Sequence, residues 1–183
     1  MFKSIDGFLR YFEGVNKRAI RDVAALPPEA QGWRPATGEG EKAWSINQLV
    51  GHMCGSRLYF ASAYSGSGWV SPEPPDVSTR ERWAPALEAS FTEFRSKIAG
   101  TPHEWLERRV DMIDTPGATL PGWRVLLMMM EHDIHHRSQI DTYAGINGWD
   151  VPDIYNRSAE TIGWLQASQR AKHGLEGDGD PLA

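Results

Sequence analysis

The segment from Trp123 to Ala144 constrains the fold most, because it has helical spacing and contains neither glycine nor proline. It predicts a long helix in the second half of the chain. This helix carries the sequence His132-Asp133-Ile134-His135-His136. Residues four apart lie on the same face of a helix, so the rings of His132 and His136 can point into the same space. Two imidazoles in this arrangement provide half of a tetrahedral transition-metal site.

The same segment also fits a solvated helix surface. His135 and Arg137 each follow an acidic residue by four positions, so both could form i,i+4 ion pairs in water. His135 projects about 100° away from His136, and we expect it outside a shared site. Taken alone, the spacing of His132 and His136 leaves both interpretations open.

The length of 183 residues suits one domain. We expect this domain over residues 1–173 and a disordered tail, rich in glycine and aspartate, over residues 174–183. The best apolar run, Val125 to Met130, is far too short to cross a membrane, and the N-terminus has no signal-peptide core. The single cysteine, Cys54, excludes an intrachain disulfide framework. These features predict a cytoplasmic protein without a membrane partner.

The charge pattern argues against nucleic-acid binding. The net charge is −5, and the arginines are scattered among acidic residues without a basic block. Proteins that bind nucleic acids need a clustered cationic face to displace counterions, so we expect no nucleic-acid partner.

Apolar spacing and helix-end signals predict five helices, over about residues 4–25, 45–66, 78–98, 120–144 and 155–173. Two sequences match the capping box that begins a helix, one from Ser45 to Gln48 and one from Ser78 to Glu81. Residues 101–120 have no helical period, and 108–113 extend briefly at most. We see no strand pattern of any length. The expected fold is all-α, an up-and-down four-helix bundle with an additional C-terminal helix.

A metal held by protein needs three or four ligands, so a further residue must join the histidine pair. His173 begins the expected tail, and His103 lies in a loop. His52 lies in the middle of the second predicted helix. Taken alone, it fits a half-buried histidine bonded to the backbone or to Ser56. The presence of the histidine pair favours a metal ligand at His52 instead, because a bundle can bring the second helix against the fourth.

Two spaced motifs resemble those of the DinB-like (DinB/YfiT) superfamily. The segment from Glu131 to Ile140 resembles its H-E-x-H-H-R-G-Q signature, and the segment from Trp44 to His52 resembles its W-S-x-x-x-L-x-x-H motif. Trp33-Arg34-Pro35 fits the family's W-x-P approach, and Gly148 and Pro152 fit its usual exit from the fourth helix. These landmarks occur in the right order over roughly residues 30–152.

The resemblance implies a four-helix bundle with a divalent metal in a pocket at one end. By position, the family's three ligands carry over to His52, His132 and His136. The resemblance also implies a homodimer. Similar members include bacillithiol S-transferases, mycothiol-dependent isomerases and metal-dependent hydrolases. Asp133 and Ser138 stand where the family usually has glutamate and glycine; neither is a ligand position, and an indirect role of the shorter Asp133 carboxylate stays open.

Three neutral histidines would leave one coordination position of the metal open, as in catalytic sites. Zinc is the expected ion, while nickel, iron or copper would also suit imidazole ligands. Such an ion lowers the pKa of a bound water or thiol. The sequence therefore predicts a small-molecule substrate, with a low-molecular-weight thiol as one candidate, and either S-transfer or hydrolysis. It assigns no catalytic side chain.

Other reactive side chains have simpler interpretations. Cys54 is two residues from His52 and therefore about 200° round the helix, which predicts a packed thiol. The run from Met128 to Met130 predicts core packing, because methionine fills irregular gaps. Arg137 is expected to pair with Asp133 or to cover the rim of the pocket.

Two alternatives to the metal-dependent transferase or hydrolase remain. In a zincin-like peptidase, Asp133 would act as the base of an H-D-x-x-H motif and Glu160 as the third ligand. Mutation separates these hypotheses: His52→Ala abolishes metal binding under the first, and Glu160→Ala under the second. The other alternative is a non-catalytic helical dimer, with or without a metal, that acts in the stress response.

Overall fold

The computed structural model describes residues 2–175. They divide into two compact units, Met1–Val151 and Pro152–Ala183, and each is described by itself. The expected single domain over residues 1–173 stays a prediction. The expected disordered tail lies outside the described residues from position 176 onward.

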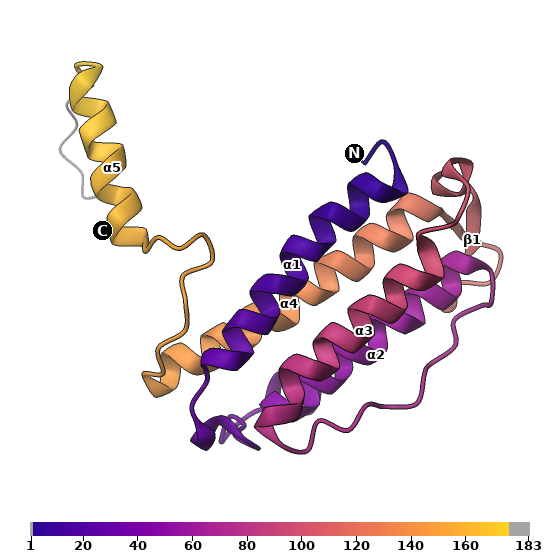
Figure 1. Ribbon diagram of the computed structural model, residues 1–183, viewed down its shortest axis with the longest axis horizontal. Coiled ribbons are helices and arrows are strands. Elements are labelled where there is room, and N and C mark those ends of the chain that lie inside the picture. The colour runs from indigo at the N-terminus through magenta and orange to yellow at the C-terminus, as the bar shows by residue number, and fades with distance from the viewer. Residues whose placement is uncertain (1, 176–183) are drawn as a thin grey trace. The chain divides into compact units, whose positions relative to one another are not determined.

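The first unit is a bundle of four helices (Figure 1): α1 (Ile5–Ala25), α2 (Ile46–Ser65), α3 (Trp83–Ile98) and α4 (Gly122–Asn147). Both α1 and α2 pack against α3 and α4, which makes a four-cornered bundle. The second unit contains α5 (Ala159–Lys172). The predicted four-helix bundle with an additional C-terminal helix is confirmed.

The helices do not alternate strictly up and down, because α2 and α3 run in the same direction. Asn47 at the start of α2 donates hydrogen bonds to the carbonyls of Val77 and Ser78 just before α3. At the other end, the Tyr64 hydroxyl of α2 lies 3.3 Å from the Thr101 hydroxyl just after α3. Residues 66–79, here called the strap, connect the two helices by running back along the bundle (Figure 1).

The strap is long enough for this return. Its three prolines, Pro72, Pro74 and Pro75, favour extended backbone. Extended at roughly 3.1 Å per residue it reaches about 40 Å. The 20 residues of α2 need only about 30 Å. Strap length therefore permits the parallel arrangement of α2 and α3.

Local signals set most helix ends. Ser4 caps α1, and both hydrogen bonds of the predicted capping box between Ser45 and Gln48 are present at α2. Gly148 ends α4 in the left-handed conformation that glycine adopts without strain. The second predicted capping box is wrong: the Ser78 hydroxyl donates to Asp76 instead, and the chain enters α3 through the 3-10 turn η3 (Arg80–Arg82). Helix α5 begins at Ala159, later than predicted, where Ser158 supplies the cap.

The connection from α3 to α4 contains the 3-10 turn η4 (His103–Leu106) and two short strands, β1 (Arg109–Asp111) and β2 (Thr119–Pro121). The strands pair antiparallel, with Val110 opposite Leu120. The expectation of no strands therefore fails for this short hairpin. Gly122 begins α4 against the carbonyl of Trp105, where a Cβ would overlap that oxygen. Further 3-10 turns are η1 (Pro28–Ala30) and η2 (Gly40–Ala43), before α2.

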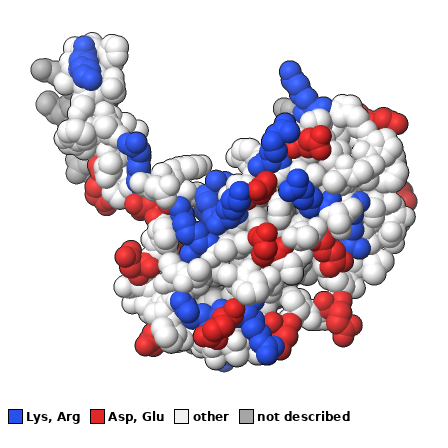
Figure 2. Space-filling view, viewed as in Figure 1, with Lys and Arg blue, Asp and Glu red and all other residues white. Residues whose placement is uncertain are grey.

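The bundle encloses an apolar core with a buried charged residue inside it. Phe8, Phe12 and Phe94 pack ring to ring at centroid distances of 5.4 to 6.2 Å. The guanidinium of Arg57 lies over the Phe12 ring, 5.5 Å from its centroid, and Arg57 is fully buried. Figure 2 shows that Lys and Arg alternate with Asp and Glu over the face of the bundle in view. Within residues 2–175, no helix combines the length and apolar character needed to cross a membrane.

Candidate metal centre

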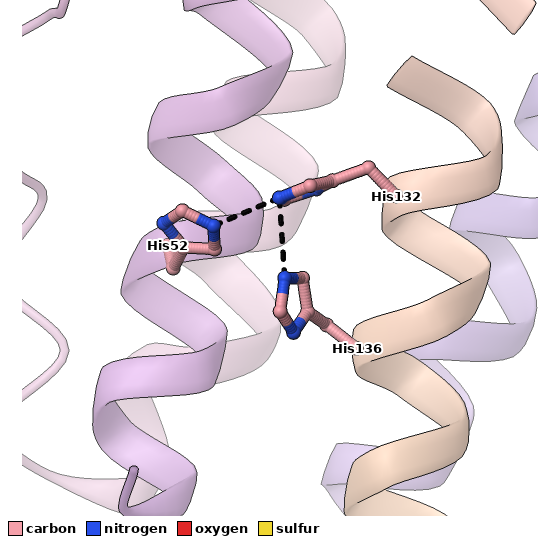
Figure 3. A group of neighbouring side chains, drawn as sticks. All are labelled: His52, His132 and His136. Carbon is pink, nitrogen blue, oxygen red and sulfur yellow. Dashed lines mark hydrogen bonds between the residues drawn. The ribbon is translucent and has the colours of Figure 1, made fainter. Parts of the chain in front are cut away.

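Three imidazole rings from two helices meet inside the bundle (Figure 3). His52 comes from α2, and His132 and His136 come from successive turns of α4. The Nε2 atom of His132 lies 2.8 Å from Nε2 of His52 and 3.1 Å from Nε2 of His136. His136 is buried, whereas His52 and His132 are half-buried. The structure thus brings together all three residues that the sequence predicted as ligands.

Hydrogen bonds alone cannot satisfy this arrangement of nitrogens. A neutral imidazole nitrogen offers either one N–H group or one lone pair. The Nε2 atom of His132 faces two other ring nitrogens, so it can form a good hydrogen bond with only one of them. Three lone pairs that point at one cation remove this conflict. Ligands of a tetrahedral zinc ion, with bonds of about 2.0–2.1 Å, lie about 3.3 Å apart, close to the observed spacings.

The electrostatic environment keeps the three rings neutral. Burial lowers the pKa of His132 to about 3, with smaller contributions from His136 and His52. Burial also lowers the pKa of His52 and that of His136. Neutral imidazole is the form that binds a metal. The donor set therefore fits a divalent transition metal near neutral pH.

Gln139 orients the ring of His136. Its side-chain oxygen lies 3.2 Å from Nδ1 of His136 and can accept a hydrogen bond from that nitrogen. Its amide nitrogen donates to the Glu41 carbonyl and to the Tyr143 hydroxyl, at 2.9 and 3.0 Å. With the proton on Nδ1, the lone pair of His136 resides on Nε2 and points at the other two histidines. Sequence reasoning gave Gln139 no role, although it belongs to the motif around the histidine pair.

A buried ion pair fixes the two helices that carry the histidines. Arg57 of α2 donates from Nε and Nη2 to the two carboxylate oxygens of Asp133 on α4, at 2.9 and 3.0 Å. It also donates to the Leu87 carbonyl and the Ser90 hydroxyl of α3. Asp133 directly follows His132, so this pair fixes the rotation of α4 against α2. Arg57 was not predicted from the sequence, although its position on the apolar face of α2 was the available signal.

Two predicted roles on α4 need correction. Arg137 does not pair with Asp133, because Asp133 faces Arg57. Instead, Nε of Arg137 lies 3.6 Å from carboxylate oxygens of Asp22 on α1 and of Asp141. Both oxygens of Asp133 are occupied by Arg57, which argues against the general base that the peptidase alternative requires. Glu160, its proposed third ligand, lies in the first turn of α5, where its carboxylate interacts with Ser158.

The other singled-out residues lie where the sequence placed them. His135 is exposed, with Nε2 3.3 Å from a carboxylate oxygen of Glu41, outside the three-histidine cluster. Glu41, His135 and His136 form a second group with metal-ligand spacing, but two of its three members are exposed. Cys54 is buried, and burial raises the pKa of its thiol. Met129 and Met130 are buried in the core. His103 lies in η4, and His173 ends α5.

A pocket of about 1000 Å³ opens beside the histidines. Its floor is α2, and the strap covers it from the other side. His52 and His132 belong to its lining, and the Ser56 hydroxyl lies 3.4 Å from Nε2 of His132. Asn47 holds the strap to α2 through the two carbonyls described above and accepts a hydrogen bond from the Gly32 amide at 2.7 Å. A small molecule in this pocket would reach the histidines directly.

Comparisons with known proteins agree with this architecture. The model of the DinB family matches residues 1–169. The uncharacterized protein YjoA of Bacillus subtilis is 29% identical over 104 residues, which cover 56% of this chain and 67% of YjoA. A DinB-like protein from Bacillus cereus has a similar solved structure, with a TM-score of 0.62, 17% identity and coverage of 84% of this chain and 99% of that one. The solved structure of YjoA gives a TM-score of 0.63 and 19% identity, and the match covers 80% of this chain and 96% of YjoA's.

Proposed function

The chain belongs to the DinB family, and from this premise we propose that it is an enzyme in which His52, His132 and His136 hold one divalent metal ion. The reaction is S-transfer from a low-molecular-weight thiol or hydrolysis of a small molecule. The observation that carries the proposal is the convergence of three ring nitrogens on one point, which no set of hydrogen bonds satisfies. Zinc is the expected ion, with nickel or iron as alternatives.

The chain itself supplies the arrangement that such chemistry needs. When bound, a divalent ion with an open position lowers the pKa of a thiol or water bound to it. Gln139 keeps the proton of His136 on Nδ1, and Arg57 with Asp133 holds α2 and α4 in register. The pocket beside His52 and His132 admits a substrate to the same point. Three protein ligands with an adjacent pocket support a catalytic rather than a structural site.

The metal is tested by elemental analysis of protein purified without chelators and without a histidine tag. We expect about one equivalent of zinc in the wild-type protein and its loss in His52→Ala, because two ligands on one helix bind a metal weakly. His135→Ala is the matched control: it removes a neighbouring histidine outside the cluster and should keep the metal. Retention of metal in His52→Ala, or its loss in His135→Ala, would refute the assigned ligand set.

Activity is tested with two model reactions on the metal-loaded protein. Transfer of a thiol to 1-chloro-2,4-dinitrobenzene reports S-transfer, and release of nitrophenol from 4-nitrophenyl acetate reports hydrolysis. We expect turnover in at least one reaction and its loss in His52→Ala. A fully loaded protein that turns over neither substrate supports the non-catalytic alternative instead.

A further inference from the structure

A serine hydroxyl lies beside the three histidines, on the side that opens to the pocket. Ser56 follows His52 by one turn of α2, so both side chains lie on the same face of that helix. The Ser56 hydroxyl is 3.4 Å from Nε2 of His132. Ser56, His52 and His132 all line the pocket. The hydroxyl therefore lies where a small molecule in the pocket would approach the proposed metal ion.

The Ser56 hydroxyl does not take the usual partner of a hydroxyl within a helix. Such groups commonly donate to the carbonyl four residues earlier, as Thr142 does to Ser138 in α4. Within residues 2–175, the Ser56 hydroxyl contacts no backbone carbonyl, and His132 is its one hydrogen-bond partner. Ser56 is only 9% exposed. Its hydroxyl is therefore directed at the histidine cluster rather than at its own helix or at open solvent.

A metal ion on the histidines would remove this partner from Ser56. Nε2 of His132 has a single lone pair, which the proposed metal ion would use. The Phe60 ring lies 6.1 Å from the His132 ring, centroid to centroid, so water has limited access to the hydroxyl. A poorly hydrated hydroxyl without an acceptor costs free energy. An oxygen or sulfur atom that enters from the pocket and binds the metal keeps lone pairs, and it can replace the lost acceptor.

We propose that the Ser56 hydroxyl donates a hydrogen bond to the oxygen or sulfur atom that a substrate places on the open position of the metal. This inference deepens the proposed function and rests on it, since it needs the metal ion. A hydrogen bond to an anionic atom stabilises its charged form. Ser56 therefore favours a thiolate over a ligand atom, such as an imidazole nitrogen, whose lone pair the metal uses fully.

Calorimetric titration of the zinc-loaded protein with two probes tests this role. 2-Mercaptoethanol binds zinc through a sulfur atom that keeps lone pairs, whereas imidazole binds through a nitrogen that keeps none. In Ser56→Ala we expect the affinity for 2-mercaptoethanol to fall about tenfold and the affinity for imidazole to stay within about twofold. An equal loss for both probes would indicate a structural role and overturn the proposal. Unchanged affinity for 2-mercaptoethanol would overturn it as well.

Two other hydroxyls of the same pocket provide matched controls. Ser71 lines the pocket from the strap, and Tyr59 lines it from α2, three residues after Ser56. Ser71→Ala and Tyr59→Phe each remove one hydroxyl, and both should leave the affinity for 2-mercaptoethanol unchanged. A tenfold loss in either control that matches the loss in Ser56→Ala would show that Ser56 is not the specific donor.

The zinc content of each variant separates this inference from the proposed function. Ser56 is not one of the three assigned ligands, so Ser56→Ala should keep about one equivalent of zinc. Loss of zinc in this variant would overturn the assigned role. A wild-type protein that binds no zinc refutes the proposed function and this inference with it. Full zinc loading without binding of 2-mercaptoethanol, or with binding that does not depend on Ser56, refutes this inference alone.

Discussion

Replacing Arg57 by methionine should destabilise the bundle far more than any exposed charge substitution. Arg57 is fully buried and donates four hydrogen bonds, two to Asp133 and one each to the Leu87 carbonyl and the Ser90 hydroxyl. Methionine keeps much of the apolar stem but none of the donors. The substitution therefore leaves the carboxylate of Asp133, which is 1% exposed, without its partner.

The expected magnitude follows from that uncompensated charge. Removing one partner of a buried ion pair costs about 3–5 kcal/mol, and the whole stability of a domain is about 5–15 kcal/mol. Arg57→Met should therefore approach the limit of folding. The double variant Arg57→Met/Asp133→Leu removes both charges, and its loss should be smaller by about 2 kcal/mol or more. The remaining loss arises from the Leu87 carbonyl and the Ser90 hydroxyl, each of which loses the hydrogen bond that Arg57 donates to it.

Urea denaturation followed by far-UV circular dichroism measures these free energies of unfolding, with a chelator present so that metal binding adds nothing. Lys17→Met serves as the control, because its ion pair with Glu13 lies on the exposed side of α1 and is screened by solvent. A loss below about 1 kcal/mol in Arg57→Met would refute the reasoning. A double variant that is no more stable than Arg57→Met would also refute this reasoning.

Three further predictions concern α4. Gly122→Ala should lower the free energy of unfolding by about 1–3 kcal/mol, because its Cβ overlaps a backbone carbonyl of η4. A Cβ at Gly145 meets nothing within 4 Å, so Gly145→Ala should raise it by about 0.5–1 kcal/mol. Thermal unfolding distinguishes the two variants, and similar shifts of their melting temperatures would contradict the close approach at Gly122. Burial raises the pKa of Asp141 from 3.8 to about 6. The stability that the protonated carboxyl contributes below pH 3.8 is therefore lost as the pH rises through 6. Asp141→Asn should therefore stabilise the protein above pH 6, by on the order of 1 kcal/mol after allowance for partial exposure, and should change its stability little near pH 3.8. Denaturation measured near pH 3.8 and above pH 6 tests this difference, and a gain that does not depend on pH would contradict it. Gln139→Leu should lower metal affinity about 10- to 100-fold by freeing the His136 tautomer, as measured by competition with a chromophoric chelator; an unchanged affinity would show that Gln139 does not orient the ring.

Most helix ends were predictable because local signals mark them. The capping box at Ser45, the proline before Gly122 and the left-handed glycine at position 148 all act over a few residues. The histidine pair was predictable for the same reason, since four-residue spacing fixes one helix face. The DinB resemblance added His52, and the structure places its Nε2 atom 2.8 Å from that of His132.

Features that depend on distant contacts were not predictable in the same way. The parallel course of α2 and α3 depends on the strap, whose path is fixed by hydrogen bonds from Asn47. The partner of Asp133 was assigned from i,i+4 spacing to Arg137, but the buried face of α4 turns Asp133 toward Arg57 on another helix. Charged residues on apolar stripes of both helices were the signal for this pair. The homodimer and the absence of a nucleic-acid partner stay predictions.

The ion pair between Arg57 and Asp133 has a consequence for how the proposed metal ion would enter and leave the protein. It joins α2 to α4 through side chains that coordinate nothing, one residue away from His132. We therefore expect the bundle to fold without the ion, unlike a zinc finger. Dialysis should strip and reload the site without passing through an unfolded chain, so that one preparation can be exchanged among zinc, nickel and iron.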